Sequence, residues 1–407
     1  MLKTIRKAEY AELTALFFIQ SMAVAIWMVP LSLVFAAHGL RAIAPYAFAA
    51  SALATFVSPL IFGAMADRHA SPVKVLRGLA VASAAAMTLF AWSVKQGWPT
   101  GLVLALVQIY ALCAAPTGSI ITAIIFSRLR NSQREYGPVR AGATVGWMAG
   151  CWLVSALNAD TSTLAEFICA ATWLALAAFT YLLPGVPPPK STRHPTLLQR
   201  LGWDSFVLLK NPDHRVVFIT VALFSIPLAA FYPFTPLHLQ ALGFRHVSAW
   251  MTLAQTTELF AMFTLAGLFL RWRLKWIFAA GLAVGVLRFA LCALNGKAWL
   301  LAGTSLHGLS FTLFFITAQI YIDERVGAEW RTRAQALMTL MTNGVGNLTG
   351  YLFTGWWFVA CARSAGTQWS LFWGVLAAAV TAVMIYFLMA YHGKEMKTQR
   401  VLETDLR

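Results

Sequence analysis

Twelve predominantly apolar stretches run through this 407-residue chain, and they constrain its fold more than any other feature. An α-helix needs about 20 such residues to cross the hydrocarbon core of a bilayer, where it satisfies its own backbone hydrogen bonds. The stretches are 12–36, 42–66, 73–94, 100–127, 140–158, 164–184, 215–240, 247–270, 275–294, 298–322, 333–360 and 368–391. The sequence therefore predicts an all-α membrane protein with twelve transmembrane helices.

The composition supports this prediction, and the placement of basic residues orients the chain. Of all residues, 59% are hydrophobic and 11% are charged, against about a quarter charged in soluble domains. With these spans, 25 of the 31 Lys and Arg residues lie in the loops and tails on one side, and five lie on the other. Basic loops stay cytoplasmic, so we expect a multi-pass protein of the cell inner (plasma) membrane with both termini cytoplasmic. The net charge of +16 is then topological and does not indicate a nucleic-acid partner.

A polar, proline-rich stretch divides the chain between the sixth and seventh spans. It begins at Pro184 and ends near Asp213, with a short interfacial helix expected around 197–209. We therefore predict an N-terminal six-helix bundle at 1–184, a cytoplasmic linker at 185–213, and a C-terminal six-helix bundle with a cytoplasmic tail at 214–407. Gly63-x-x-x-Asp67-Arg68 closes the second span and Gly267-x-x-x-Arg271 closes the eighth, which indicates two similar halves.

Glu258 is the acidic residue that lies mid-way through a predicted span. A charge at the centre of a bilayer costs at least ~2.5 kcal/mol, so such residues usually face a cavity and mark a solute or proton path. A protonated glutamic acid bonded to a neighbouring helix is the alternative. Gln255 lies one turn away on the same helix face and would line the same cavity.

Arg140 opens the fifth span, and Thr144 follows one turn later. An arginine here either lines a cavity or extends its charged end to the membrane interface. Gly142, Gly146 and Gly150 lie along the same span at intervals of four, a pattern that permits tight helix contact.

Three further polar features lie inside spans. Arg288 needs a carbonyl, polar or acidic partner, so structural pairing is as plausible as contact with solute. His307 titrates near neutral pH in water, but a lone membrane histidine usually bridges helices. The band from Thr342 to Gly350 in the eleventh span either lines the pathway or packs, and packing is the simpler interpretation.

The sequence lacks the signatures of soluble enzymes. It contains no phosphate-binding P-loop, so no ATP-driven motor is expected within the chain, and no metal-ligand spacing. The five Cys lie in apolar segments without paired spacing. We expect no enzymatic activity, no cofactor and no metal.

Two sets of motifs carry a family resemblance. Gly63-Ala64-Met65-Ala66-Asp67-Arg68 resembles the cytoplasmic loop signature of the major facilitator superfamily, which implies that fold and a gating role for Asp67 and Arg68. Other segments are similar to the nucleoside–proton symporter family: Tyr136 to Arg140 with Thr144 to Gly146, Gln255 with Glu258, Arg288 to Leu291, Arg333 to Ala336, and Met341 to Gly344.

The resemblance to nucleoside–proton symporters implies a central site. Its residues would be Arg140, Thr144, Gln255, Glu258 and Phe311. Thr312 stands where that family has an aspartate, and apolar positions around Pro227 and Ala230 replace polar ones. The segment 229–234 and the pair Leu306-His307 are similar to the related permeases linked to phenylpropionate.

These observations predict a secondary active transporter. The first hypothesis is proton-coupled symport of a nucleoside-like polar metabolite by alternating access. Glu258 would carry the proton, Gln255, Thr144 and Arg140 would bind solute, and Phe311, Tyr232 and Trp27 would stack on a ring. A permease for aromatic acids, with Arg140 or Arg288 holding the carboxylate, or for sugars is an alternative on the same fold; a non-transporting membrane receptor is another. We expect a monomer whose partners are the small-molecule solute, protons and the lipid bilayer.

Overall fold

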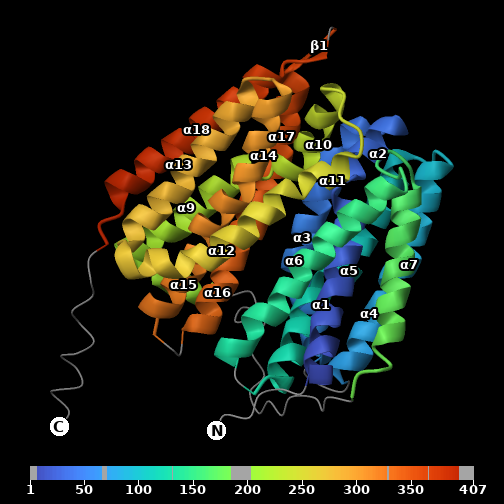
Figure 1. Cartoon of the computed structure of the whole chain (residues 1–407), viewed down its shortest axis with the longest axis horizontal. Helices are drawn as coiled ribbons and strands as arrows, with labels where there is room; N and C mark the ends of the chain where they lie inside the picture. The colour runs from blue at the N-terminus through green and yellow to red at the C-terminus, as the bar shows by residue number, and fades with distance from the viewer. Residues whose placement is uncertain are drawn as a thin grey trace.

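A computed structural model describes residues 7–66, 71–130, 132–184, 203–327, 330–364 and 366–393. Two groups of long helices lie side by side, with α1 to α7 in one half and α9 to α18 in the other (Figure 1). The predicted gating residues Asp67 and Arg68 lie outside the described residues, as do linker residues 185–202.

The first half contains the first six predicted spans. Its elements are α1 (Lys7–Met28), α2 (Leu31–Ala37), η1 (Arg41–Ile43), α3 (Ala44–Ala66), α4 (Pro72–Lys95), α5 (Thr100–Arg128), α6 (Ser132–Ala156) and α7 (Leu164–Phe179). Pro30 interrupts the first span between α1 and α2, because a proline lacks the amide donor that a continuous helix needs.

The second half contains the other six predicted spans. Its elements are η2 (Trp203–Lys210), α9 (Pro212–Leu228), α10 (Phe231–Ala241), α11 (Val247–Met251), α12 (Leu253–Arg271), α13 (Leu274–Ala293), α14 (Lys297–Phe311), η3 (Thr312–Ile316), α15 (Thr317–Arg325), α16 (Arg331–Thr339), η4 (Leu340–Asn347), α17 (Leu348–Ala360), β1 (Ala362–Arg363), β2 (Gly366–Thr367) and α18 (Trp369–Ala390). Two of these, η3 and η4, are π-helical turns within long helices. The two short strands pair antiparallel.

Each predicted span coincides with one helix or with consecutive helices, so the all-α membrane fold is confirmed. Among the described residues, seven helical segments are long and apolar enough by themselves to cross a membrane. α7 is shorter than predicted: it ends at Phe179, whereas the predicted sixth span ends at 184. The described part of the expected interfacial helix forms η2, where the Ser205 hydroxyl donates to the carbonyl of Arg333, 2.8 Å away.

Buried apolar side chains form one large cluster in each half. The first cluster is built almost entirely from residues between Leu13 and Leu183, and the second mostly from residues between Val216 and Tyr391. The exceptions lie where the halves meet: Ala229 and Tyr351 join the first cluster, and Ala25, Val29, Leu33 and Cys151 join the second. The domain boundaries at 184 and 214 remain a prediction.

The glycine ladder of α6 lies directly against α1. A Cβ atom at Gly142 would collide with Thr14, one at Gly146 with the backbone of Phe18, and one at Gly150 with the carbonyl of Met22. Glycine therefore sets the close approach of these two helices, as the spacing predicted. This packing fixes the face of α6 that carries Arg140 and Thr144.

The two halves pack together where α3 meets η4 and α17. They also meet at one end of the molecule, which we call the closed end and which contains α2, α10 and α11 (Figure 1). Asp160, from the turn before α7, accepts a hydrogen bond of 2.6 Å from the amide of Ser248. The Ser155 hydroxyl accepts one of 2.9 Å from the amide of Ala249, and the Ser155 carbonyl accepts one of 2.9 Å from Nδ1 of His246. We call these five residues the latch.

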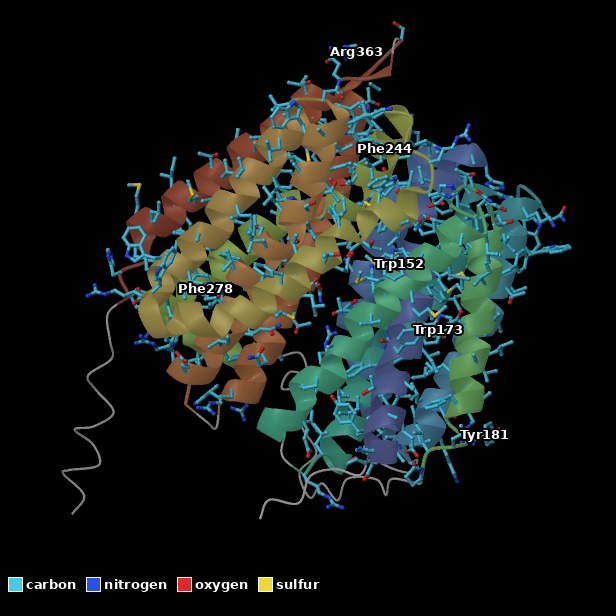
Figure 2. The ribbon with its side chains drawn as sticks, in the orientation of Figure 1. Trp152, Trp173, Tyr181, Phe244, Phe278 and Arg363 are labelled. Carbon is cyan, nitrogen blue, oxygen red and sulfur yellow. The ribbon has the colours of Figure 1, made fainter. Side chains whose placement is uncertain are left out.

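Trp152 adds a neighbouring contact between the halves. Its indole donates to the Thr252 hydroxyl over 3.2 Å, and Figure 2 shows Trp152 between α6 and the helices of the second half. The opposite end, which we call the open end, contains the start of α1, the turn between α5 and α6, the C-terminal end of α15 and the N-terminal end of α16 (Figure 1).

Candidate functional site

A cavity of about 460 Å³ lies between the two halves. Its wall carries polar and aromatic side chains from both of them. The first half contributes Ser21, Arg140, Thr144 and Trp147, and the second contributes Ser225, Tyr232, Gln255, Glu258, His307, Phe311, Phe315, Gln319, Gln335, Thr339, Thr342, Asn343, Asn347 and Tyr351. Gln319 on α15 and Gln335 on α16 show that the cavity reaches toward the open end.

The structure brings six of the seven predicted solute-binding residues to this one cavity. They come from four helices that are distant in sequence: α6, α10, α12 and α14. These residues are Arg140, Thr144, Tyr232, Gln255, Glu258 and Phe311. Their roles in binding remain predictions.

Glu258 and Arg140 line the same cavity from opposite halves. The described ion pairs within 4.0 Å are those of Arg128, so Glu258 and Arg140 are not locked together. The Arg140 guanidinium lies 5.7 Å from the centre of the Phe17 ring. Both groups can bind solute across this polar space, and the carboxyl of Glu258 can also take up and release a proton, whereas a guanidinium stays charged.

Glu258 is positioned by the close crossing of α12 and α14. A Cβ atom at Gly308 would collide with the carbonyl of Ala254 and with the amide of Glu258. The Thr257 hydroxyl also donates to the carbonyl of Ser305 at this crossing. Glycine thus allows the helices to touch, and the contact places His307 beside Glu258 on the cavity wall.

Aromatic rings cover the same wall. Phe311 stacks on Phe315 with ring centres 5.1 Å apart, and Tyr232 lies 5.7 Å from Trp147 of the other half. Flat apolar surfaces of this kind suit a planar ring in a solute. Sequence reasoning missed Trp147, although it lies three residues after Thr144 and therefore on nearly the same face of α6.

Trp27 lies apart from the other six predicted residues. It lines a second cavity of about 270 Å³ that is bounded by α1, α3 and α5. Its ring is buried edge-on against Tyr110, at 4.9 Å between centres. The two cavities share Asn343, Asn347 and Tyr351 on their walls. Trp27 faces away from the central cavity because its side of α1 packs into the first half.

The polar side chains of the band in the eleventh span lie on the cavity wall, whereas its glycines Gly346 and Gly350 pack against α9, as the packing interpretation expected. Thr342, Asn343 and Asn347 line the cavity, and the Asn347 amide donates to Asn343 over 3.0 Å. They belong to the π-helical turn η4, and Phe315 belongs to the other, η3. Wide π turns interrupt regular helix geometry and frequently occur at functional sites.

Arg288 is buried behind the cavity wall and is not among the residues that line it. Its Nη1 lies 2.5 Å from Nδ1 of His307, and its guanidinium lies over the rings of Phe231 and Phe289, at 5.0 and 4.6 Å. This geometry agrees with structural pairing. It places Arg288 away from any carboxylate bound in the cavity.

A second buried acid, Glu166, lies outside both cavities. It is in the first turn of α7, its side chain is completely buried, and neither carboxyl oxygen has a hydrogen-bond partner among the described residues. Its place near the start of a span gave no signal of this burial.

Comparisons with known proteins agree with these features. The family described as nucleoside H+ symporters matches residues 8–396. A putative nucleoside transporter, YegT of Escherichia coli (strain K12), is 29% identical over 97% of both chains. The nucleoside permease NupG of the same organism is 24% identical over 86% of this chain and 88% of the relative.

Solved structures show the same fold. A crystal structure of the nucleoside transporter NupG superposes with a TM-score of 0.83 at 23% identity, over 95% of this chain and 99% of the other. The peptide-transporter-family protein PepTSo superposes with a TM-score of 0.72 at 13% identity, over 95% and 98%. The chain has the fold of these transporters, is a membrane carrier rather than an enzyme, and belongs to the nucleoside H+ symporter family.

Proposed function

We propose that this protein imports a nucleoside-like solute together with protons, by alternating access to the central cavity, and that Glu258 carries the proton. The observation that carries the proposal is the position of Glu258. It is an acid on the cavity wall, beside Gln255, and Arg140 of the other half lines the same cavity. Rocking of the halves would change the distance between Glu258 and Arg140, and with it the stability of the ionised carboxyl.

The solute would bind between polar groups and aromatic faces. Arg140, Thr144 and Gln255 offer hydrogen bonds suited to a ribose and to polar base atoms, while Phe311 and Tyr232 offer surfaces for a ring. Family membership supports nucleoside-like cargo over aromatic acids. The burial of Arg288 behind the wall removes one of the two cations that an aromatic-acid carrier would use.

Two matched variants test the role of Glu258. In proteoliposomes with an imposed pH gradient, Glu258→Gln should abolish accumulation of radiolabelled uridine, while counterflow exchange without a gradient continues. Glu166→Gln is the control, because it removes a completely buried carboxyl that does not line the cavity. It should leave both activities intact. Normal gradient-driven uptake by the Glu258→Gln protein would refute the assignment.

The excess of basic residues in one set of loops supports cytoplasmic termini. The closed end then faces outward and the cavity opens inward. Arg363 lies in β1 at the closed end (Figure 2), so a cysteine at that position should react with a membrane-impermeant maleimide added to intact cells. Wild-type protein controls for the native cysteines. Labelling only after the cells are opened would invert the proposed topology. We also propose that the functional unit in the bilayer is a monomer.

A further inference from the structure

His307 and Arg288 form an unusual pair for the interior of a membrane protein. The imidazole is 8% exposed and the guanidinium 1%, and 2.5 Å separates Nη1 of Arg288 from Nδ1 of His307. No acid accompanies them among the described ion pairs. The arginine cation is instead stabilised by the lone pair of Nδ1 and by the faces of two phenylalanine rings.

The chemistry of the two groups fixes the direction of this hydrogen bond. A guanidinium has only donors, so Nδ1 of His307 must accept. A neutral imidazole carries one proton, and with Nδ1 as acceptor that proton must lie on Nε2. A second proton on Nδ1 would place two cations in contact in a buried site, with no room left for the hydrogen bond.

The second nitrogen of the ring, Nε2, lies on the edge away from the contact with Arg288. One face of the imidazole lies flat on Phe231, with centres 3.7 Å apart and planes 9° from parallel. Among the described residues, none forms a hydrogen bond with Nε2. Nε2 also does not belong to the fully buried polar atoms that lack a hydrogen-bond partner. His307 itself lines the central cavity. The free N–H of Nε2 therefore remains available there.

We propose that Arg288 is a positioning residue that holds His307 as the Nε2–H tautomer, so that His307 donates a hydrogen bond to the transported solute. This inference rests on the proposed function of the cavity. It specifies that the solute has an acceptor at this wall, such as a carbonyl oxygen or an unprotonated ring nitrogen. It also implies that His307 does not carry the coupled proton, because the ring stays neutral while Arg288 donates a hydrogen bond to it.

Spectroscopy tests the tautomer directly. Protein labelled with ¹⁵N-histidine would be examined in nanodiscs at pH 8 and pH 6, with His307→Gln identifying the signals of this ring. We expect an unprotonated Nδ1 and a protonated Nε2 at both values. In Arg288→Met the lock is gone, so both tautomers and a pH-dependent imidazolium should appear, while Arg288→Lys restores a donor and the wild-type pattern.

Other ionisable groups near the pair are Glu258 on α12, Tyr232 on α10 and Cys292 on α13. Glu258→Gln, examined in the same way, shows whether the carboxyl shifts the His307 signals. A wild-type ring with the proton on Nδ1, or protonated on both nitrogens at pH 6, would overturn the proposal. So would an unchanged spectrum in Arg288→Met.

A matched pair of substitutions tests the hydrogen bond to solute. Glutamine places its amide nitrogen near the position of Nε2 and keeps the donor to the cavity, whereas asparagine reaches only the position of Nδ1. We expect His307→Gln to bind radiolabelled uridine within about threefold of wild type, and His307→Asn to bind it up to roughly tenfold more weakly, the factor for one lost hydrogen bond. Equal affinities for the two variants would contradict the assignment.

Failure of this inference can be distinguished from failure of the proposed function. A wild-type protein that neither binds nor accumulates nucleosides would refute the proposed function, whatever the tautomer of His307. Normal nucleoside accumulation with equal binding by the glutamine and asparagine variants would refute only the inference. The two substitutions also keep the test valid if Arg288→Met does not fold.

Discussion

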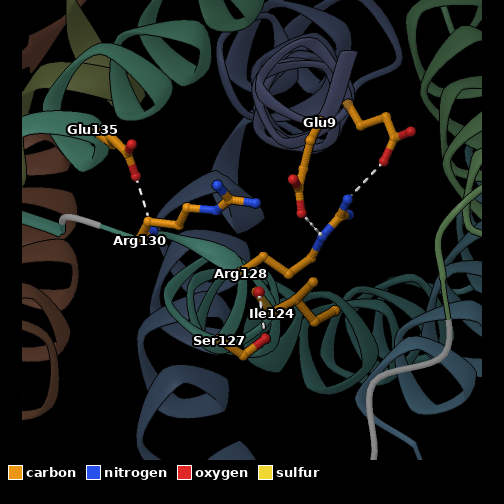
Figure 3. A network of polar contacts seen from close by, with 7 residues as sticks. Glu9, Ile124, Ser127, Arg128, Arg130 and Glu135 are labelled. Carbon is orange, nitrogen blue, oxygen red and sulfur yellow. Dashed lines mark hydrogen bonds and ion pairs between the residues drawn. The ribbon is translucent and has the colours of Figure 1, made fainter. Parts of the chain in front are cut away.

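At the closed end, backbone and side-chain hydrogen bonds cross between the two halves, whereas the contacts described at the open end join residues of the same half. Arg128 binds Glu9 and Glu12 at 3.3 and 2.9 Å, and Glu135 accepts from the amide of Arg130 at 3.0 Å, all within the first half (Figure 3). In the second half, Nδ1 of His214 lies 2.8 Å from the hydroxyl oxygen of Tyr321. Each half therefore stabilises its own open end.

The difference shows how the halves could separate at modest cost. The latch consists of three hydrogen bonds between the halves, and Asp160 supplies the single ionisable acceptor. Such bonds contribute about 1 kcal/mol each, or more when one partner is charged. An outward-facing state that breaks the latch and brings the open ends together is thus within reach of solute and proton binding.

The largest effect should come from preventing separation at the closed end. Trp152 and Thr252 are hydrogen-bonded across the halves, so cysteines at both positions can be joined by a short, reducible thiosulfonate cross-linker. We expect complete loss of uptake that reducing agent restores. Each single-cysteine protein, treated in the same way, should transport normally. Undiminished uptake by the cross-linked protein would mean that this end does not open.

A smaller effect should follow from weakening the latch. Asp160→Asn replaces a charged acceptor, so we expect the ratio of outward-facing to inward-facing protein to rise by roughly tenfold or more. Spin labels at Ser127 and Glu324, two exposed positions on opposite halves at the open end that do not line the cavity, would report this as a larger short-distance population. Glu12→Gln, which removes an acid paired within one half, should not shift the distribution. An unchanged distribution in Asp160→Asn would deny the latch a conformational role.

The smallest effect is expected at the exposed rim of the closed end. Arg41 donates to Thr367 over 3.4 Å and lies 4.8 Å from the ring centre of Phe358, both in the other half. Exposed contacts of this kind contribute about 0.5–1 kcal/mol, so Arg41→Gln should shift the same spin-label distribution only about two- to fivefold. A shift as large as that of Asp160→Asn would mean that the rim, and not the latch, holds the closed end.

Hydropathy and charge predicted the fold well, because a bilayer permits few ways to bury apolar helices. The spans agreed with the helices to within a few residues at most boundaries, although residue patterns did not reveal the π turns η3 and η4. Those turns depend on how side chains from other helices pack, and local sequence does not encode that information. The glycine ladder of α6 was readable because close approach requires the absence of a side chain.

The site was predicted only in part. Glu258 and Gln255 stood out because polar groups inside a span must face something other than lipid, and Arg140, Thr144 and Phe311 followed from family resemblance. Trp27 was assigned to the central cavity, but it lines the neighbouring one, since hydropathy does not report which face of α1 is turned inward. His307 was interpreted as a helix contact, and its partner Arg288 comes from another helix, which no local pattern indicates.

The latch constrains the amino-acid sequence of the first half more than that of the second half. In two of its three hydrogen bonds the second half contributes main-chain amides, those of Ser248 and Ala249, which every residue except proline possesses. The first half must instead provide specific side-chain oxygens at Ser155 and Asp160. Substitutions should therefore be tolerated better at Ala249 than at Ser155 or Asp160, so saturation mutagenesis would find position 249 open to many residues but closed to proline. Position 248 is completely buried and should accept only small side chains.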